Sequence, residues 1–68
     1  MNNTLNLSKE IYTQSKIEKA IKDYQSLCEI ELEENVKYFS CIFSNCKYSM
    51  DLTINEFENY VIDLMNVV

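Results

Sequence analysis

The chain has 68 residues, of which 47% are apolar, and its aromatic side chains are five tyrosines and three phenylalanines. This composition excludes a disordered chain, and the length predicts a single domain, residues 1–68, with one thin core and little room for a deep catalytic cleft. The net charge of −5, with lysine as the only basic residue type, argues against a surface for nucleic acid or anionic lipid.

The first part of the chain predicts a short strand followed by a helix. Residues 4–8 alternate, with Leu5 and Leu7 on one side, as is typical of a strand. Thr13 is a plausible N-cap, and apolar residues then recur at three- and four-residue spacing. These features predict an amphipathic helix over about residues 14–26.

At Cys28 the period of the pattern changes from 3.6 to 2. Cys28, Ile30 and Leu32 share one side, and Glu29, Glu31 and Glu33 share the other. Residues 28–33 therefore predict a strand with one buried face and one face in water.

A second strand follows after a short turn. Glu34-Asn35 is the only polar pair before the next apolar run, so we expect a two-residue hairpin turn there. Residues 36–43 are apolar on both faces and rich in β-branched and aromatic side chains, which indicates a strand in the middle of a sheet.

The last third of the chain predicts a loop and a second helix. Residues 44–49 are polar, and Thr53 and Glu56 have the spacing of a capping box, with Leu52 and Phe57 placed as a hydrophobic staple. One face of the helix is apolar. Its members are Ile54, Phe57, Val61, Leu64 and Val68.

These elements predict an α+β fold of two layers, in the order β-α-β-β-α. A right-handed crossover through the first helix makes the first two strands parallel, with the third strand between them and the acidic strand at an edge. Both helices then cover one face of the three-stranded sheet. The other face is open and carries Asn6, Glu29, Glu31, Glu33, Tyr38, Ser40 and Ile42.

The residues with reactive side chains do not form a catalytic or metal-binding pattern. Histidine, the commonest general base and metal ligand, is absent, and the spacing of Cys28, Cys41 and Cys46 matches no zinc or iron–sulfur motif. An odd number of cysteines predicts reduced thiols in a cytosol, with Cys28 and Cys41 in the core and Cys46 in a loop. We expect no enzyme activity, no cofactor and no metal.

The chain begins Met-Asn-Asn-Thr, without a cationic segment leading into an apolar run, and no stretch approaches the roughly 20 apolar residues of a membrane span. We therefore expect a cytoplasmic protein that does not enter a membrane. Two lysines and eight acidic residues give residues 28–68 a net charge of −6. This charge solvates the fold, and it could also attract a basic partner.

Five residues on the open face are the candidates for binding a partner. Glu29, Glu31 and Glu33 would meet lysine or arginine side chains, or would only solvate an edge strand and discourage aggregation. Tyr38 and Ile42 are the apolar anchors.

The pattern of the chain from residue 4 to residue 64 resembles the small D-type accessory proteins of His-Xaa-Ser radical-SAM peptide-maturation systems (HxsD-like). The resemblance implies a non-catalytic adaptor for a radical-SAM maturase or its precursor peptide, without iron–sulfur ligands of its own. The residues that carry it are Leu5, Leu7, Ile11, Tyr12, Ile17, Ala20, Ile21, Tyr24, the run 28–32 and the strand 36–43.

Three functions remain open on the sequence. The leading one is an accessory domain that binds a peptide or protein through an exposed strand edge and the open face. The second is a structural homodimer closed through the open face. The third is an acidic inhibitor that mimics nucleic acid toward a basic protein.

Overall fold

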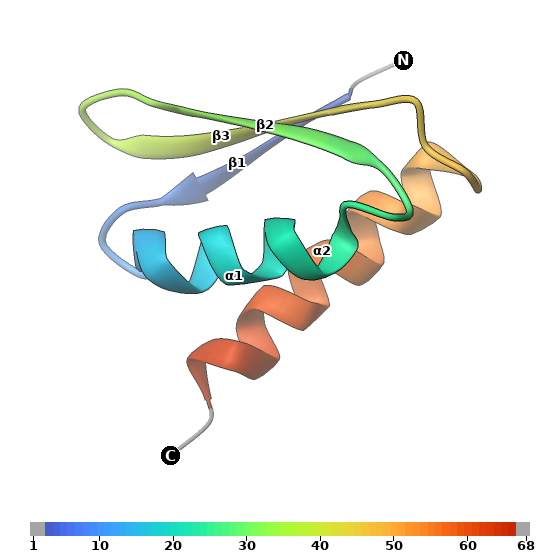
Figure 1. Cartoon of the computed structure of the whole chain (residues 1–68). Coiled ribbons are helices and arrows are strands. Elements are labelled where there is room, and N and C mark those ends of the chain that lie inside the picture. The colour runs from blue at the N-terminus through green and yellow to red at the C-terminus, as the bar shows by residue number, and fades with distance from the viewer. Residues whose placement is uncertain (1–2, 67–68) are drawn as a thin grey trace.

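The computed structural model describes residues 3–66. Its elements follow the order β1 (Thr4–Ser8), α1 (Gln14–Tyr24), β2 (Glu29–Glu34), β3 (Tyr38–Ser44) and α2 (Met50–Met65), as Figure 1 shows. The predicted α+β class and the β-α-β-β-α order are confirmed. The first helix is shorter than expected, because it ends at Tyr24.

The three strands form one sheet in the order β1-β3-β2. Both β1 and β2 pair antiparallel with β3, so β1 and β2 run parallel to each other at the two edges. This is the predicted topology, with the acidic strand at an edge and the strand that is apolar on both faces in the centre.

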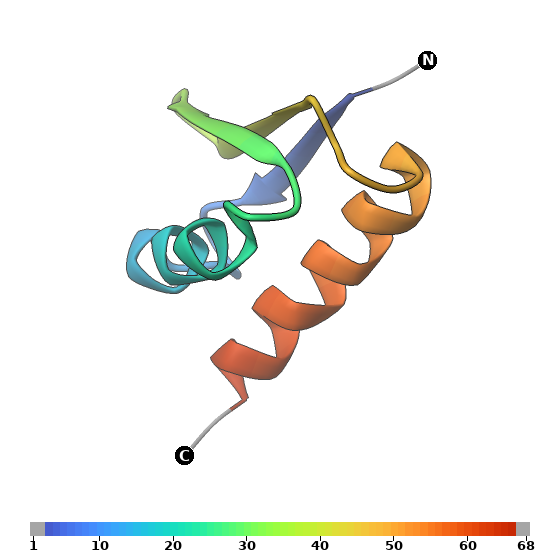
Figure 2. The same ribbon diagram turned by 45° about the vertical axis from the view of Figure 1, so that its right-hand side comes forward.

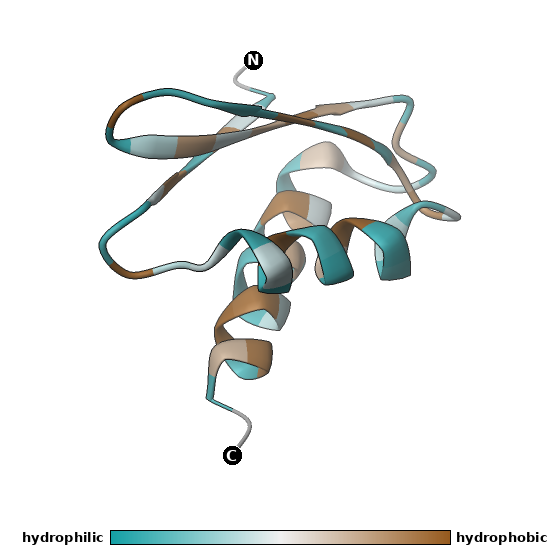
Figure 3. Ribbon diagram, turned by 60° about the vertical axis from the view of Figure 1, so that its left-hand side comes forward, coloured by the Kyte–Doolittle hydropathy of each residue, from teal (hydrophilic) through white to brown (hydrophobic). Residues whose placement is uncertain are grey.

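Both helices lie on the same side of the sheet, α1 beneath β2 and α2 running out at an angle beneath β1 (Figures 1 and 2). Their apolar stripes pack onto the sheet face that carries Leu7, Phe39, Cys41 and Phe43. Brown and teal segments alternate along the strands in Figure 3, as a sheet with one covered face requires. The buried apolar residues are Leu7, Ile17, Ala20, Cys28, Phe39, Cys41, Phe43, Phe57 and Val61.

Phe57 is the centre of the contact between the helices and the sheet. Its ring meets Phe43 edge-on at 5.2 Å between centroids and Tyr24 edge-on at 5.4 Å. Edge-to-face aromatic pairs add about 0.5–1.5 kcal/mol beyond the area they bury. Phe57 therefore joins α1, α2 and β3, as its place in the predicted apolar stripe suggested. Val68, the last member of that stripe, lies outside the described residues.

A small polar group joins α1 and α2 beside this aromatic contact. The Tyr60 hydroxyl donates a hydrogen bond to the Asp23 carboxylate, which also accepts one from Lys19. These two hydrogen bonds, that from Tyr60 first, lower the pKa of Asp23, and the bond to Asp23 raises the pKa of Tyr60.

The hairpin between β2 and β3 turns two positions later than predicted. Strand β2 continues through Glu34, and the tip is Val36-Lys37 rather than Glu34-Asn35. The Asn35 side-chain oxygen accepts hydrogen bonds from the backbone N–H groups of Lys37 and Tyr38, at 2.9 and 2.8 Å. An asparagine side chain that replaces a backbone acceptor in this way can close a turn without glycine.

The start of α2 also differs from the prediction. The N-cap is Ser49, whose hydroxyl accepts a hydrogen bond from the backbone N–H of Leu52, so α2 begins about one turn before the expected capping box. Thr53 is buried inside the helix and donates its hydroxyl proton to the Ser49 carbonyl oxygen at 2.8 Å. Leu52, the proposed staple residue, is 62% exposed. At α1 the expected N-cap position, Thr13, is correct, but its side chain makes no capping hydrogen bond.

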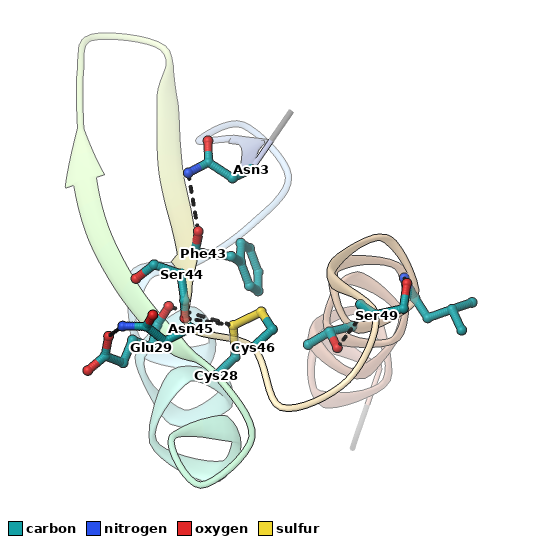
Figure 4. Close-up of a disulfide and its surroundings, with 10 residues drawn as sticks. Asn3, Cys28, Glu29, Phe43, Ser44, Asn45, Cys46 and Ser49 are labelled. Carbon is teal, nitrogen blue, oxygen red and sulfur yellow. Dashed lines mark hydrogen bonds between the residues drawn. A yellow bond between two sulfur atoms is a disulfide. The ribbon is translucent and has the colours of Figure 1, made fainter. Parts of the chain in front are cut away.

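A disulfide links Cys28 to Cys46, so the prediction of three reduced thiols was wrong (Figure 4). The two residues meet because the Lys47 N–H donates to the Leu27 carbonyl oxygen at 2.8 Å, which holds the loop after β3 against the start of β2. Asn45 begins that loop at a φ of 51°, a left-handed conformation that asparagine tolerates better than most residues. Cys41 is the free cysteine and lies in the core, as predicted.

Candidate partner-binding face

The register of the sheet defines which side chains occupy the face away from the helices. We call this surface the open face. All five predicted partner-binding residues belong to it, so the structure brings them onto one surface. By alternation from the observed pairs, the face consists of Thr4, Asn6, Ser8, Glu29, Glu31, Glu33, Tyr38, Ser40, Ile42 and Ser44.

Cross-strand rows order this face. Ile42 lies between Thr4 on β1 and Glu31 on β2. In the next row Ser40 lies opposite Glu33 and donates its hydroxyl proton to the Asn6 side-chain oxygen at 2.7 Å. The centre of the face is therefore hydroxyl and amide groups around a single aliphatic side chain.

Three acids form a straight row along β2. Glu29 accepts a hydrogen bond from the Asn45 side-chain amide at one end of the row (Figure 4). Among residues 3–66, Glu31 and Glu33 have no hydrogen bond or ion pair from their carboxylates. Of the described residues on the open face, none is a lysine that could balance them, and we call Glu29, Glu31 and Glu33 the acidic row.

Glu34 does not belong to this row, although it continues the acidic run of the sequence. Side chains alternate along the strand, so that of Glu34 lies on the helix side of the sheet, where its carboxylate is 2.6 Å from the Lys9 ammonium. Lys9 also lies 5.3 Å from the centroid of the Phe39 ring. This pair closes the end of the core beneath the hairpin, so Glu34 has a structural contact that Glu31 and Glu33 lack.

Tyr38 and Ile42 share the open face but do not form one apolar patch. They are four residues apart on β3, about 13 Å along a strand, and Ser40 lies between them. Tyr38 is 43% exposed and borders a shallow depression of about 340 Å³ with Ser8, Lys9 and Val36. The two predicted anchors are therefore separate contact points.

A second concave surface lies on the other side of the molecule, where sequence patterns gave no sign of it. It is a groove of about 490 Å³ between β1 and the first half of α2. It depends on the distance between a strand and a helix that are far apart in the chain, which no local pattern encodes. Its lining residues are Thr4, Leu5, Asp51, Ile54, Asn55 and Glu58.

Within residues 3–66, no three side chains of the metal-binding types gather at one point. No helix in this part of the chain has the length and apolar character to cross a membrane. Comparisons with protein-family models, with curated proteins and with solved structures gave no match. The candidate site therefore rests on its geometry.

Proposed function

We propose that this chain is a non-catalytic accessory domain that binds a peptide or protein partner carrying lysine or arginine side chains. The observation that carries the proposal is the acidic row, two of whose three carboxylates have no partner among the described residues while Glu34 beside them is paired. In keeping with the family resemblance, the partner would be a radical-SAM maturase or its precursor peptide.

The free edge of β2 supports binding of an extended partner. The Asn35 N–H donates to the Tyr38 carbonyl oxygen, which fixes the odd-numbered residues of β2 as those bonded to β3. The backbone groups of Ile30, Leu32 and Glu34 then point away from the sheet. A strand added there would place every second side chain beside the acidic row, at the spacing of about 7 Å that separates alternate strand residues.

The expected affinity is modest and depends on salt. Exposed ion pairs contribute about 0.2–1 kcal/mol each, so three pairs contribute roughly 0.6–3 kcal/mol. Screening by salt weakens them, since the Debye length falls from about 10 Å at 0.1 M to about 3 Å at 1 M. Backbone hydrogen bonds along β2 would supply the part of the affinity that salt leaves unchanged.

The same surface disfavours the structural homodimer. Two open faces stacked on each other would bring six carboxylates of two acidic rows into one interface, with only Tyr38 and Ile42 of each copy as apolar contacts. Uncompensated charges in an interface cost more than so small an apolar area returns. A basic partner has no such penalty.

The proposal includes a cytoplasmic location, and this bears on the disulfide. Cytosolic thiol buffers reduce most disulfides, so Cys28 and Cys46 would be thiols beside a cytosolic enzyme. Pairing of β2 with β3 defines which side chains occupy the open face, and the disulfide adds stability to the domain without taking part in that pairing. Binding through the acidic row should therefore survive reduction in the protein that remains folded, and alkylation of thiols in intact cells would show which state occurs there.

Charge reversal at the acidic row tests the proposal. The probe is a short peptide in which lysine and threonine alternate, and the comparison peptide has the same composition with its lysines in one block. Glu31→Lys with Glu33→Lys should lower the affinity for the alternating peptide by about tenfold or more. The matched control is Glu56→Lys with Asp63→Lys, which makes the same change in net charge on the exposed side of α2.

Three results would count against the proposal. One is equal loss of affinity in both double variants, which would mean that only net charge matters. Another is equal binding of the alternating and block peptides, which would remove the spacing argument. The last is no binding of the alternating peptide at low salt.

A further inference from the structure

We propose that the groove between β1 and α2 is a second docking site, which takes an extended segment of a partner polypeptide with a lysine or arginine between apolar residues. This goes beyond the proposed function, because the groove lies at the opposite edge of the sheet from β2 and on the helix side of it. Figure 2 shows how α2 lies relative to β1.

The outer edge of β1 has backbone groups ready to pair. The Phe43 N–H donates to the Asn3 carbonyl oxygen and the Lys9 N–H to the Lys37 carbonyl oxygen, so the odd-numbered residues of β1 face β3. The N–H and C=O of Asn6 and the N–H of Ser8 therefore point to the outer edge. Among residues 3–66, none of these three groups has a hydrogen-bond partner.

The groove beneath this edge has an apolar floor and acidic walls. Leu5 and Ile54 are half-buried and supply the floor. Asp51 and Glu58 lie two helical turns apart on the same side of α2, about 10 Å along its axis. Neither carboxylate has a hydrogen bond or ion pair within the described part of the chain, and no lysine lines the groove.

The negative charge of Glu58 also acts on Tyr12. Burial is the first cause of the raised pKa of Tyr12, and the negative charge of Glu58 is the second. A cationic side chain in the groove would relieve this negative potential.

The dimensions fit a strand rather than a helix. Strand β1 is five residues long, about 13 Å from its first to its last residue, so a segment extended along it is long enough to pass both acids, which lie about 10 Å apart. An extended segment beside β1 would direct alternate side chains down into the groove, where Leu5 and Ile54 meet apolar groups and the carboxylates meet a cation. A helix could not use the free N–H and C=O of Asn6.

A second copy of this chain is a poorer occupant. Pairing β1 with β1 of another copy would bring two grooves with unbalanced carboxylates together, on chains that each carry a net charge of −5. Charge complementarity therefore favours a basic segment from a different polypeptide.

Selection from a displayed library of random peptides tests the proposal, followed by binding measurements with the selected peptides as synthetic probes. The selection is made on Glu31→Lys with Glu33→Lys, so that the acidic row does not capture cationic peptides. We expect peptides with lysine or arginine between apolar residues. Asp51→Asn with Glu58→Gln should weaken their binding by about two- to 25-fold, since each ion pair contributes at most about fivefold.

A backbone variant tests strand pairing separately. Asn6→Pro removes the outward N–H but no hydrogen bond to β3, because even-numbered residues of β1 face the free edge, where proline is tolerated. Asn6→Ala is the matched control, since it also loses the bond to Ser40 but keeps the N–H. Binding should fall several-fold in the proline variant relative to the alanine variant, while amide spectra of both show the folded sheet.

The proposal fails if the library yields no binder. It also fails if the selected peptides show no preference for a basic residue, or if the neutralised groove binds them as well as the unaltered one. Should the proline variant lose the folded sheet, neutralisation of Asp51 and Glu58 still decides the question. Sedimentation without peptide would detect a dimer that forms through β1. Such a dimer would contradict the proposal that the groove takes a segment of a different polypeptide.

Discussion

The Cys28 sulfur is bonded to the Cys46 sulfur, so the residue before β2 is fixed to the loop that leads into α2. Cys28 is also fully buried beneath the sheet. The bridge joins cysteines that are 18 positions apart in the sequence, and the segment between them is the β2–β3 hairpin with its flanks. It therefore constrains the element that carries the acidic row.

Breaking this bridge should destabilise the domain strongly. A cross-link closing a loop of this length contributes about 3 kcal/mol in the chain-entropy account, a large share of the roughly 3–10 kcal/mol expected for 68 residues. Thermal denaturation with and without reductant measures the effect. Cys28→Ala with Cys46→Ala is the control, because its melting temperature should not respond to reductant. An unaltered chain that melts at the same temperature in both conditions would contradict this account.

Cys41 should be an inert thiol whose ionisation destabilises the folded protein. Burial raises the pKa of the Cys41 thiol to about 11 from an ordinary value of 9.0. Because the pKa of Cys41 is raised in the folded state, the protonated thiol contributes to the free energy of unfolding. This contribution is complete below about pH 9 and is lost as the pH rises through about 11. A pKa shift of this size corresponds to a change of roughly 2–3 kcal/mol in the free energy of unfolding.

Melting temperatures measured from neutral to alkaline pH check this prediction. The melting temperature of Cys41→Ala should fall less steeply above about pH 9 than that of the unaltered chain. Ionisation of the tyrosines should lower the melting temperature of both proteins equally. A thiol reagent should find one reactive group after denaturation and none before it. Rapid labelling of the native protein would show that Cys41 is accessible.

The Asn35 side chain should hold the hairpin turn. It accepts two backbone hydrogen bonds, from Lys37 and Tyr38, and Val36 at the tip is 91% exposed and adds no packing. Asn35→Ala leaves both N–H groups to water and should cost about 1–2 kcal/mol. Asn35→Asp keeps an acceptor oxygen and should cost less. Equal stability of the two variants in chemical denaturation would mean that the side chain does not close the turn.

The strand pattern and its sheet order were predictable because they depend on side-chain alternation and on the handedness of one crossover. Cys28, Ile30 and Leu32 lie on the helix side and Glu29, Glu31 and Glu33 on the open face, as the change of period indicated. Both features are local or nearly so, and the whole acidic row follows from them.

The turn and the helix start were predicted wrongly because competing local signals stood close together. Glu34-Asn35 looked like the turn, but Glu34 pairs with Lys9 and extends the strand. Thr53 had a capping pattern, yet Ser49 lies one turn earlier, and an earlier start lets Met50 pack against the core. Only tertiary contacts decide between such alternatives.

The disulfide and the groove could not be predicted from spacing. Cys28 and Cys46 meet through the backbone hydrogen bond between Leu27 and Lys47, which forms only when β3 lies beside β2. The groove needs the position of α2 relative to β1, a contact between the two ends of the chain.

The central claim is that the acidic row binds a basic extended partner along β2. Amide proton–nitrogen correlation spectra recorded while the alternating lysine–threonine peptide is added test it most directly. We predict that the amides of Ile30, Leu32 and Glu34 shift and gain protection from exchange, because their N–H groups face the free edge. Shifts confined to other parts of the chain, or no shifts at low salt, would contradict the claim.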